Sequence, residues 1–355
     1  MKIANIVETY KQDLVEKYGR RLLPSHRKAL DAILACKNAC GHFTLQCDTC
    51  EQATYHALSC GHRSCPRCQN TDTTEWLQRQ YDKLLPVPYF MVTFTLPSEL
   101  RKMAWQNQSL IYDLLFKVAK ACLQELAKDQ RYLGAELGMT GVLHTHTRQL
   151  EYHPHVHFIV PGGGIAKDKG KTFFKQLEKD FLVHGKALAK LFRGRFIYAL
   201  LEAGFSLPSH ISKTWVVNVQ SIGTGKPALQ YLSRYLYRGV IAEKNIVACK
   251  NGKLTFKYKD SQTQTVNTRT LDAVDFIWKL LTHVLPRGFR RVRDYGIVHP
   301  NAKQKRSLIQ LLLRVSIPIA KQKPKIKPKC AACQGETYVA GVYPKRIPMQ
   351  LIFSP

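Results

Sequence analysis

The chain has 355 residues, 45% of them hydrophobic, and its 54 Lys and Arg residues exceed its 25 acidic residues by 29 charges. The apolar content excludes global disorder, and the length corresponds to about two domains with a tail. So large a positive excess indicates a polyanionic partner, with nucleic acid as the first candidate and an anionic membrane surface as the second.

The membrane alternative has little support in the sequence. No stretch reaches the roughly 18 apolar residues that cross a bilayer, and residues 1–17 lack the apolar core of a signal peptide. We therefore expect a cytoplasmic protein without a membrane partner. In a reducing compartment, the eleven cysteines favour metal ligation over disulfides.

Apolar periodicity predicts an alternation of helices and strands along the chain. We expect helices over residues 1–35, 71–85, 98–128, 173–203, 227–238 and 271–285. We expect strands over 89–96, 215–220 and 254–258, and an antiparallel hairpin over 139–160 with its turn near Leu150 and Glu151. Residues 287–329 then hold thirteen Lys or Arg and one acid, and their last part, KQKPKIKPK, is typical of an extended basic linker.

Residues 36–68 contain seven of the eleven cysteines. Cys47 and Cys50 form one CxxC pair, and Cys65 and Cys68 form another after fourteen intervening residues. This spacing is close to that of a zinc ribbon, in which four thiolates complete a tetrahedron. We therefore expect one structural zinc ion with these four ligands.

The tripeptide Cys-Gly-His occurs twice in the same region. The two copies would supply a second, interleaved zinc site with four ligands, Cys40, His42, Cys60 and His62. Cys36 is an alternative to Cys40, and His56 is a spare, so the sequence predicts one or two structural zinc ions. Cys330 and Cys333 form a third CxxC pair, which no second pair follows, and it stays unassigned.

Residues 153–160 read HPHVHFIV and predict a strand. His155 and His157 point to the same face of such a strand, with Val156 buried behind them. Two imidazoles on one rigid strand are half of a divalent metal site, with coordination positions left for phosphate oxygens.

The preceding strand carries His144 and His146, again two residues apart. A hairpin symmetric about residues 150 and 151 would place His144 opposite His157 and His146 opposite His155. We expect His144 to be the third metal ligand, with Glu151 and His153 as alternatives.

Residues 231–238 read YLSRYLYR and predict a helix in which Tyr231 and Tyr235 share one face. Phenol is a poor nucleophile at its free pKa of about 10. A divalent metal on the phosphate and a cation such as Arg234 would make its attack feasible. Taken alone, tyrosines at this spacing are typical of packed or surface aromatics. The presence of the histidine pair favours a catalytic role for them.

Together these motifs resemble a known family. His155-Val156-His157 is similar to the His-hydrophobe-His motif of HUH endonucleases, and the tyrosine pair resembles that of their rolling-circle transposase branch. The chain most resembles bacterial insertion-sequence transposases with an N-terminal zinc-binding domain. The stretches that carry this resemblance are SCGHRSCPRCQ at 59–69, VLHTH at 142–146, YHPHVHFIVPGGG at 152–164, YLSRYLYR at 231–238 and HVLPRGFRRVRDYG at 283–296.

The resemblance implies a function and a mechanism. Mg²⁺ or Mn²⁺ held by His155 and His157 would polarise a phosphodiester of single-stranded DNA. Tyr231 or Tyr235 would attack it, giving a 5′-phosphotyrosine and a free 3′-OH, and the second tyrosine would allow strand transfer. Single-stranded transposon ends and target DNA would be the partners, and the protein would be associated with the nucleoid. We expect five arginines to contact DNA, namely Arg234, Arg238, Arg290, Arg291 and Arg293.

For the architecture, the resemblance implies an α+β fold, an HUH-type antiparallel sheet with flanking helices behind a small zinc-binding domain. The expected domains are a helical and zinc-binding domain at 1–85, an endonuclease domain at 86–300 and a basic segment at 301–355. Two alternatives remain at this stage. One is a replication initiator or relaxase with the same chemistry, and the other is a non-catalytic zinc-ribbon regulator that binds DNA. The oligomeric state is left open.

Overall fold

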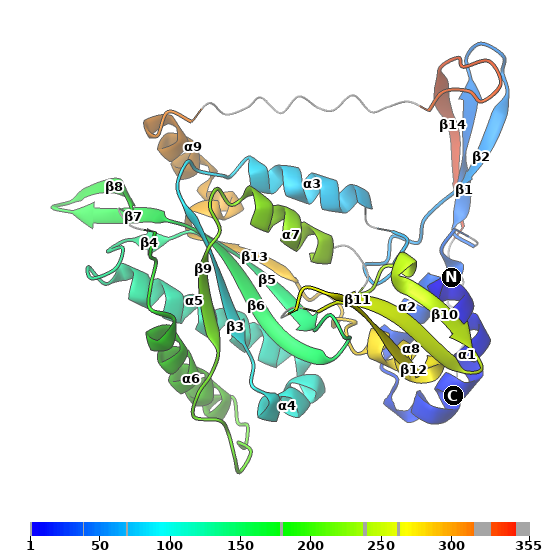
Figure 1. Ribbon diagram of the computed structural model, residues 1–355. Coiled ribbons are helices and arrows are strands. Elements are labelled where there is room, and N and C mark those ends of the chain that lie inside the picture. Colours follow the sequence, from blue (N-terminus) through cyan, green and yellow to red (C-terminus); the bar gives the residue numbers. More distant parts are fainter. Residues whose placement is uncertain are drawn as a thin grey trace. The chain divides into compact units, whose positions relative to one another are not determined.

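The computed structural model describes residues 2–37, 39–68, 70–177, 180–236, 240–260, 263–315 and 328–345 (Figure 1). The chain divides into two compact units, each made of separate segments. The first, here the cysteine unit, comprises Met1–Thr71, Tyr237–Val284 and Pro318–Pro355. The second, here the sheet unit, comprises Asp72–Leu236 and Leu285–Ile317. The chain thus returns twice to the cysteine unit, a path that the expected consecutive domains do not include.

In its described residues, the cysteine unit has three helices and two three-stranded sheets. The helices are α1 (Ile3–Tyr18), α2 (Pro24–Ala35) and α8 (Ala273–Leu281), with the 3₁₀ turns η1 (Gly19–Arg21) and η3 (Glu243–Asn245). One sheet has the order β14-β1-β2, formed by β1 (Gly41–Cys47), β2 (Ala53–Ala57) and β14 (Thr337–Pro344). The other has the order β10-β11-β12, formed by β10 (Ile246–Lys250), β11 (Lys253–Lys259) and β12 (Val266–Asp272).

Helices from the first two segments of this unit pack together. The Tyr18 ring at the end of α1 stacks on the Trp278 ring of α8, with 4.6 Å between the ring centroids. Asp275, in the same helix as Trp278, accepts hydrogen bonds from Lys17 at 2.6 Å and from the Tyr18 hydroxyl at 2.8 Å. Phe276 of α8 in turn packs on Phe256 of β11. The N-terminal helices therefore share a core with a segment more than 200 residues later.

The sheet unit contains longer helices and two further sheets. Its helices are α3 (Asn70–Tyr81), α4 (Arg101–Gln106), α5 (Gln108–Lys128), α6 (Gly185–Glu202), α7 (Lys226–Leu236) and α9 (Lys303–Leu312), with η2 (Ser98–Leu100), η4 (Gly296–Val298) and η5 (Pro300–Ala302). The central sheet is formed by β3 (Tyr89–Thr95), β5 (Met139–His146), β6 (Tyr152–Pro161), β9 (Val217–Ser221) and β13 (Val292–Tyr295). A smaller sheet is formed by β4 (Glu136–Leu137), β7 (Gly163–Asp168) and β8 (Lys171–Gln176).

The central sheet has the order β13-β5-β6-β3-β9, and every neighbouring pair is antiparallel. Side chains alternate between its faces, and Phe94 and Phe158 point into a core where Phe94 packs on Phe192 of α6. Figure 1 shows α5 and α6 on that side of the sheet and α7 on the other. By the same alternation, His155 and His157 lie on the face away from α5 and α6. The predicted α+β class and the antiparallel hairpin over 139–160 are both confirmed.

The helix expected over residues 173–203 begins later than predicted. Residues 171–176 form β8, which pairs with β7, and α6 starts only at Gly185. The aromatic pair Phe173 and Phe174 favours a strand once β7 offers an edge to pair with. Among the described helices, none is both long enough and apolar enough to span a bilayer.

Candidate functional site

Three imidazoles from β5 and β6 meet on one face of the central sheet. His144 lies directly opposite His155 across the two strands, and His157 follows on the same face. The ring centroids are 5.3 Å apart for His144 and His155, 4.6 Å for His144 and His157, and 4.8 Å for His155 and His157. One ring nitrogen from each of the three lies within 4.8 Å of the others. This is the spacing of ligands around a single metal ion.

The hairpin that builds this group has a different register from the one predicted. The observed partner of His157 is Val142, two residues from the predicted His144, and that of His146 is Tyr152, three residues from the predicted His155, so the predicted register was wrong. The turn is centred nearer residue 149, because the Thr147 and Leu150 backbones form its hydrogen bonds and Leu150 takes a positive φ of 66°. Three-residue hairpin loops often end in such a left-handed residue. A bulge between His144 and His146 completes the shift.

The alternative third ligands lie outside the group of three. The guanidinium of Arg101 donates a hydrogen bond to Nδ1 of His153 at 2.8 Å. This nitrogen of His153 is therefore already bound to a positively charged side chain. The His146 ring stacks on the His144 ring, with 6.5 Å between the centroids, beyond the bulge. Glu151 lies in the turn, where its backbone pairs with Thr147. His144 is therefore the residue that the geometry favours beside His155 and His157.

Burial keeps these imidazoles neutral at pH 7. His144 is 6% exposed and His157 is 9% exposed. Desolvation lowers the pKa of His155 to about 4 and the pKa of His157 to about 3. Burial, followed by the neighbouring His157 and His155, also takes the pKa of His144 well below its usual value. A neutral imidazole offers the lone pair that a metal ion requires, so the group fits a divalent cation.

Neighbouring atoms orient two of the rings. Nδ1 of His155 donates to the backbone carbonyl of His153 at 2.7 Å, which leaves Nε2 as the ligand atom. Nδ1 of His157 lies 2.8 Å from the Thr93 hydroxyl on β3. Sequence reasoning identified neither Thr93 nor Arg101, because neither belongs to a motif. The strand 89–96 was predicted, but its register against β6, which sets Thr93 opposite His157, was not.

Replacing Thr93 by valine should weaken Mn²⁺ binding by about tenfold, with the fold retained. The substitution keeps the volume and removes the hydroxyl that holds the His157 ring, and losses of such outer partners typically cost 10–100-fold in metal affinity. Isothermal titration with Mn²⁺ measures the change. Thr172→Val, in β8 of the other sheet of the same unit, is the control and should bind as the unchanged protein does. Equal affinities for both variants would contradict the role given to Thr93.

The predicted tyrosine helix is present as α7, which spans Lys226–Leu236. Tyr231, Arg234 and Tyr235 lie in this helix, and their side chains are outside the described residues, as are Tyr237 and Arg238 entirely. Leu229 and Leu232 are buried and anchor the helix. The helix backbone lies close to β5, the strand that carries His144. The helix that bears the expected nucleophiles therefore contacts one strand of the histidine group.

The arginines expected to contact DNA from residues 290–293 differ in their surroundings. Arg290 is exposed, and Arg291 is half-buried with its backbone carbonyl bound by the Leu143 amide. The Arg293 guanidinium pairs with Asp113 and lies 4.4 Å from the centroid of the Phe116 ring. These contacts give Arg293 a role in packing β13 onto α5, whereas Arg290 has a charge open to solvent.

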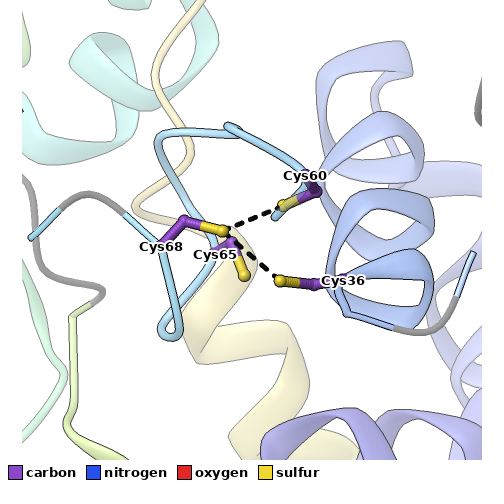
Figure 2. A group of neighbouring side chains, drawn as sticks. All are labelled: Cys36, Cys60, Cys65 and Cys68. Atoms are coloured by element: carbon purple, nitrogen blue, oxygen red, sulfur yellow. Dashed lines mark hydrogen bonds between the residues drawn. The ribbon is translucent and has the colours of Figure 1, made fainter. Parts of the chain in front are cut away.

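In the cysteine unit, the sulfur atoms gather into groups that differ from the predicted ones. Cys36, Cys60, Cys65 and Cys68 form one group with all sulfurs within 4.8 Å of one another. Figure 2 shows the Cys68 sulfur between those of Cys36 and Cys60, at 3.3 and 3.5 Å. The CxxC pair of residues 47 and 50 lies elsewhere, with Cys330 and Cys333. The two CxxC pairs expected to share one zinc ion are therefore divided between two groups.

The first group has the character of a structural zinc site. Its members are buried or partly buried, and four thiolates form a closed set without a free position. Hydrogen bonding from Cys60, followed by the Arg67 amide, lowers the pKa of Cys65 to about 5, which favours the thiolate. The Arg67 side chain also donates to the Cys36 carbonyl at 3.2 Å and joins the end of α2 to the CxxC turn.

The remaining residues predicted to bind zinc lie outside both groups. The Cys40 thiol donates to the Ala35 carbonyl at 3.2 Å. The His42 ring stacks on Tyr343 of β14, with 5.1 Å between centroids. Nδ1 of His62 accepts a hydrogen bond from the Ser64 amide at 3.2 Å. Of the second predicted set of four zinc ligands, Cys60 alone lies in one of the two cysteine groups. Cys36, the predicted alternative to Cys40, lies in the same group as Cys60.

Comparisons with known proteins identify the family of the chain. A family model described as "Putative transposase" matches residues 138–306, and one described as "Transposase zinc-binding domain" matches residues 6–96. The chain is 34% identical over 340 residues to the putative transposase y4qJ of Sinorhizobium fredii, covering 86% of this chain and 84% of that one. It is 29% identical over 273 residues to the transposase for insertion sequence element IS801 of Pseudomonas savastanoi pv. phaseolicola, covering 72% and 65%.

Solved structures of the conjugative relaxase TrwC with DNA are also similar, at 14% identity. One, with a 27-mer DNA, has a TM-score of 0.28 and covers 64% of this chain and 74% of that one. The other, with OriT DNA, has a TM-score of 0.29 and covers 64% and 72%. The sequence relatives decide the assignment. The chain belongs to the family of insertion-sequence transposases that carry an N-terminal zinc-binding domain.

Proposed function

We propose that this transposase nicks and rejoins single-stranded DNA through a 5′-phosphotyrosine intermediate, with Mg²⁺ or Mn²⁺ at His144, His155 and His157. The observation that carries the proposal is the convergence of three neutral imidazoles on one face of the sheet, beside the helix that bears Tyr231 and Tyr235. A set of three nitrogen ligands leaves coordination positions open for phosphate oxygens. A closed structural site would leave none.

The histidine group prepares the phosphate for attack. His144, His155 and His157 would hold the divalent cation, which would supply Lewis-acid polarisation of the scissile phosphate. The imidazoles hold their orientation through Thr93 and the His153 carbonyl, so little reorganisation is needed as charge develops. Arg101, which donates to His153, adds a positive charge near the phosphate path.

The tyrosines carry the covalent step. The phenol oxygen of Tyr231 or Tyr235 attacks phosphorus and loses its proton, and the bond from phosphorus to the 3′ oxygen breaks. The 5′ end of the downstream strand is then bound to the tyrosine, and the 3′ oxygen takes up a proton and leaves as a hydroxyl. A 3′-OH from another strand reverses the reaction and restores the tyrosine. Because the phosphodiester energy is kept in the phosphotyrosine, transfer needs no external energy source.

The charge of the protein supports the choice of partner. The chain carries 29 more positive than negative charges, and contacts with phosphates release counterions and provide affinity without sequence preference. Exposed cations such as Arg290 lie in the segment that leads into β13 of the central sheet. The expected place of action is the cytoplasm, where the element's DNA is found.

A covalent adduct is the direct test of the tyrosine chemistry. The full-length protein is incubated with Mn²⁺ and single-stranded oligonucleotides that tile the DNA flanking its own coding sequence. With a label at the 3′ end, the protein should carry the label on a denaturing gel, because the downstream fragment is the one that becomes attached. A 5′ label should instead appear in a shortened free strand. Mass spectrometry of the digested adduct should locate the DNA on Tyr231 or Tyr235.

Matched variants complete this test. Tyr231→Phe with Tyr235→Phe should abolish the adduct, since phenylalanine keeps the ring and lacks the oxygen. Tyr198→Phe, at an exposed position of α6, should leave it unchanged. An adduct that persists in the double variant would refute the assignment of the nucleophiles. The absence of an adduct with every oligonucleotide would favour a DNA-binding regulator.

A further inference from the structure

The second group of cysteines joins two segments that are very distant in sequence. The sulfurs of Cys47 and Cys333 are 3.4 Å apart, those of Cys50 and Cys330 are 3.6 Å apart, and those of Cys50 and Cys333 are 3.4 Å apart. The two CxxC pairs are separated by 280 residues, counted from Cys50 to Cys330. The match to the zinc-binding domain ends at residue 96 and therefore contains only half of this group.

The sulfur spacing fits one tetrahedral metal ion. Four thiolates at the usual zinc–sulfur distance of about 2.3 Å place their sulfurs about 3.8 Å apart. The observed separations are close to that value and far from the roughly 2.05 Å of a disulfide bond. Four thiolates without a histidine or carboxylate are typical of Zn²⁺ and of iron–sulfur clusters.

The backbones around the two CxxC pairs have the same conformation. The Cys47 amide donates to the Gln52 carbonyl at 3.0 Å, and the Cys330 amide donates to the Gly335 carbonyl at 2.9 Å. Each bond runs from the first cysteine to the fifth residue after it. The residue after the second cysteine is left-handed in both, with φ of 56° at Glu51 and 61° at Gln334. These are two copies of one turn, which face each other across the sulfurs.

The two CxxC turns also contact each other through a backbone hydrogen bond and close packing. The Asp48 amide donates to the Glu336 carbonyl at 3.0 Å, from one turn to the other, and the Thr49 amide points at the Cys47 sulfur at 3.4 Å. A Cβ at Gly335 would lie 3.0 Å from the Cys47 sulfur and 2.6 Å from the Thr49 hydroxyl. Only glycine leaves room for this approach. Such amide–sulfur bonds and close backbones are the surroundings that a thiolate metal site requires.

We propose that Cys47, Cys50, Cys330 and Cys333 bind a single Zn²⁺ ion that fastens the C-terminal strand β14 to the N-terminal hairpin of β1 and β2. The site is separate from the one at Cys36 and does not depend on the DNA chemistry proposed above.

The strand pairing next to this site explains why a metal is needed. β14 pairs with β1 along its whole length, from Gly41 opposite Pro344 to Cys47 opposite Thr337. Most of β14 and β2 is exposed to solvent, so the sheet has little apolar core. Small sheets without a buried face are marginally stable in water. The zinc ion would stabilise the pairing of β14 with β1, which a buried apolar core does not stabilise.

At the other end of the same sheet, β1 and β14 also approach each other closely at Gly41. Gly41 has a φ of 89°, and a Cβ there would lie 2.1 Å from the Tyr343 carbonyl and 2.6 Å from the Lys345 amide. The Lys345 amide donates to the Cys40 carbonyl at 3.1 Å. Contacts at both ends of β1 thus define where β14 lies, with the sulfur group at one end and Gly41 at the other.

The zinc content of the purified protein distinguishes a chain with two zinc sites from a chain with one. The full-length chain, purified without chelators, should contain two zinc ions by atomic emission spectrometry. Cys330→Ser with Cys333→Ser should contain one, and so should Cys36→Ser with Cys60→Ser. Cys249→Ser, in the same unit and outside both groups, should keep two. Iron in place of the second zinc would overturn the choice of metal, and a Cys330 and Cys333 variant that retains two zinc ions would overturn the site.

Hydrogen exchange tests the fastening itself. In the Cys330 and Cys333 variant, the amides of β1 and β14 that pair with each other should exchange at least tenfold faster, whereas those of α1 and α2 should be unaffected. A rise in exchange throughout the cysteine unit would indicate general unfolding and would contradict a local role. Unchanged exchange in β1, with zinc lost, would show that pairing does not need the ion and would also refute the proposal.

Discussion

Replacing His155 and His157 together by alanine should slow formation of the covalent DNA adduct by about a thousandfold or more at millimolar Mn²⁺. A divalent cation that acts as a Lewis acid on a phosphoryl oxygen supplies several kcal/mol of transition-state stabilisation, and each 1.4 kcal/mol is about tenfold in rate. Removing two of three ligands leaves His144 alone, which cannot hold the cation at millimolar concentrations. The measurement is single-turnover cleavage of a labelled strand.

Two additional results make this expectation specific. His210→Ala removes an exposed histidine of the sheet unit and should cleave at the unchanged rate. The double variant should still melt cooperatively, because replacing buried neutral imidazoles by alanine removes volume but leaves no buried charge. A correctly folded double variant that forms adducts within tenfold of the normal rate would show that these imidazoles do not hold the catalytic metal.

Cys65→Ser should remove one zinc ion and destabilise the part of the cysteine unit that contains α2 and the turn at Cys65 and Cys68. Metal binding to structural zinc sites provides about 10–16 kcal/mol in small zinc domains, which equals or exceeds the 5–15 kcal/mol that stabilises a typical domain. The Cys36 group joins the end of α2 to the turn at Cys65 and Cys68, so losing the ion frees both segments. Hydrogen exchange of α2 should therefore rise strongly.

The sheet unit gives this experiment its internal reference. Its core is built from β3, β6, α5 and α6 and contains none of the four ligands, so exchange in β6 should stay slow. Cys249→Ala is the control substitution within the cysteine unit and should retain both zinc ions. If Cys65→Ser keeps its full zinc content and the protection of α2, the closed tetrathiolate site does not stabilise this unit.

The sequence was informative where chemistry and local periodicity coincide. The motif around His155 predicted a strand, a shared face for two imidazoles and the hairpin partner that supplies His144, and these features are present. The register was missed because it depends on the left-handed Leu150, and no rule places a leucine there in advance. That side chain is 1% exposed, so tertiary burial compensates the local strain.

The zinc ligands show the opposite case. Spacing rules pair cysteines that are near in sequence, and by those rules Cys47 and Cys50 were matched with Cys65 and Cys68. The structure matches them with Cys330 and Cys333, because β14 pairs with β1. A strand pairing that brings together CxxC pairs 280 residues apart leaves no trace in the cysteine spacing of either segment. The same holds for Thr93, which reaches His157 only through sheet register.

The distance between the two halves of the second cysteine group has a consequence for biosynthesis. At 5–20 residues per second, the ribosome needs about 14–56 s to proceed from Cys50 to Cys330, whereas Cys36 and Cys68 are separated by only 32 residues. On this timing the first cysteine group would be complete early, and β3, β5, β6 and β9 of the central sheet are made well before the second set of ligands is complete. During that interval Cys47 and Cys50 are a free dithiol, which makes this pair the point most open to oxidation or to capture of a foreign metal while the transposase is being made.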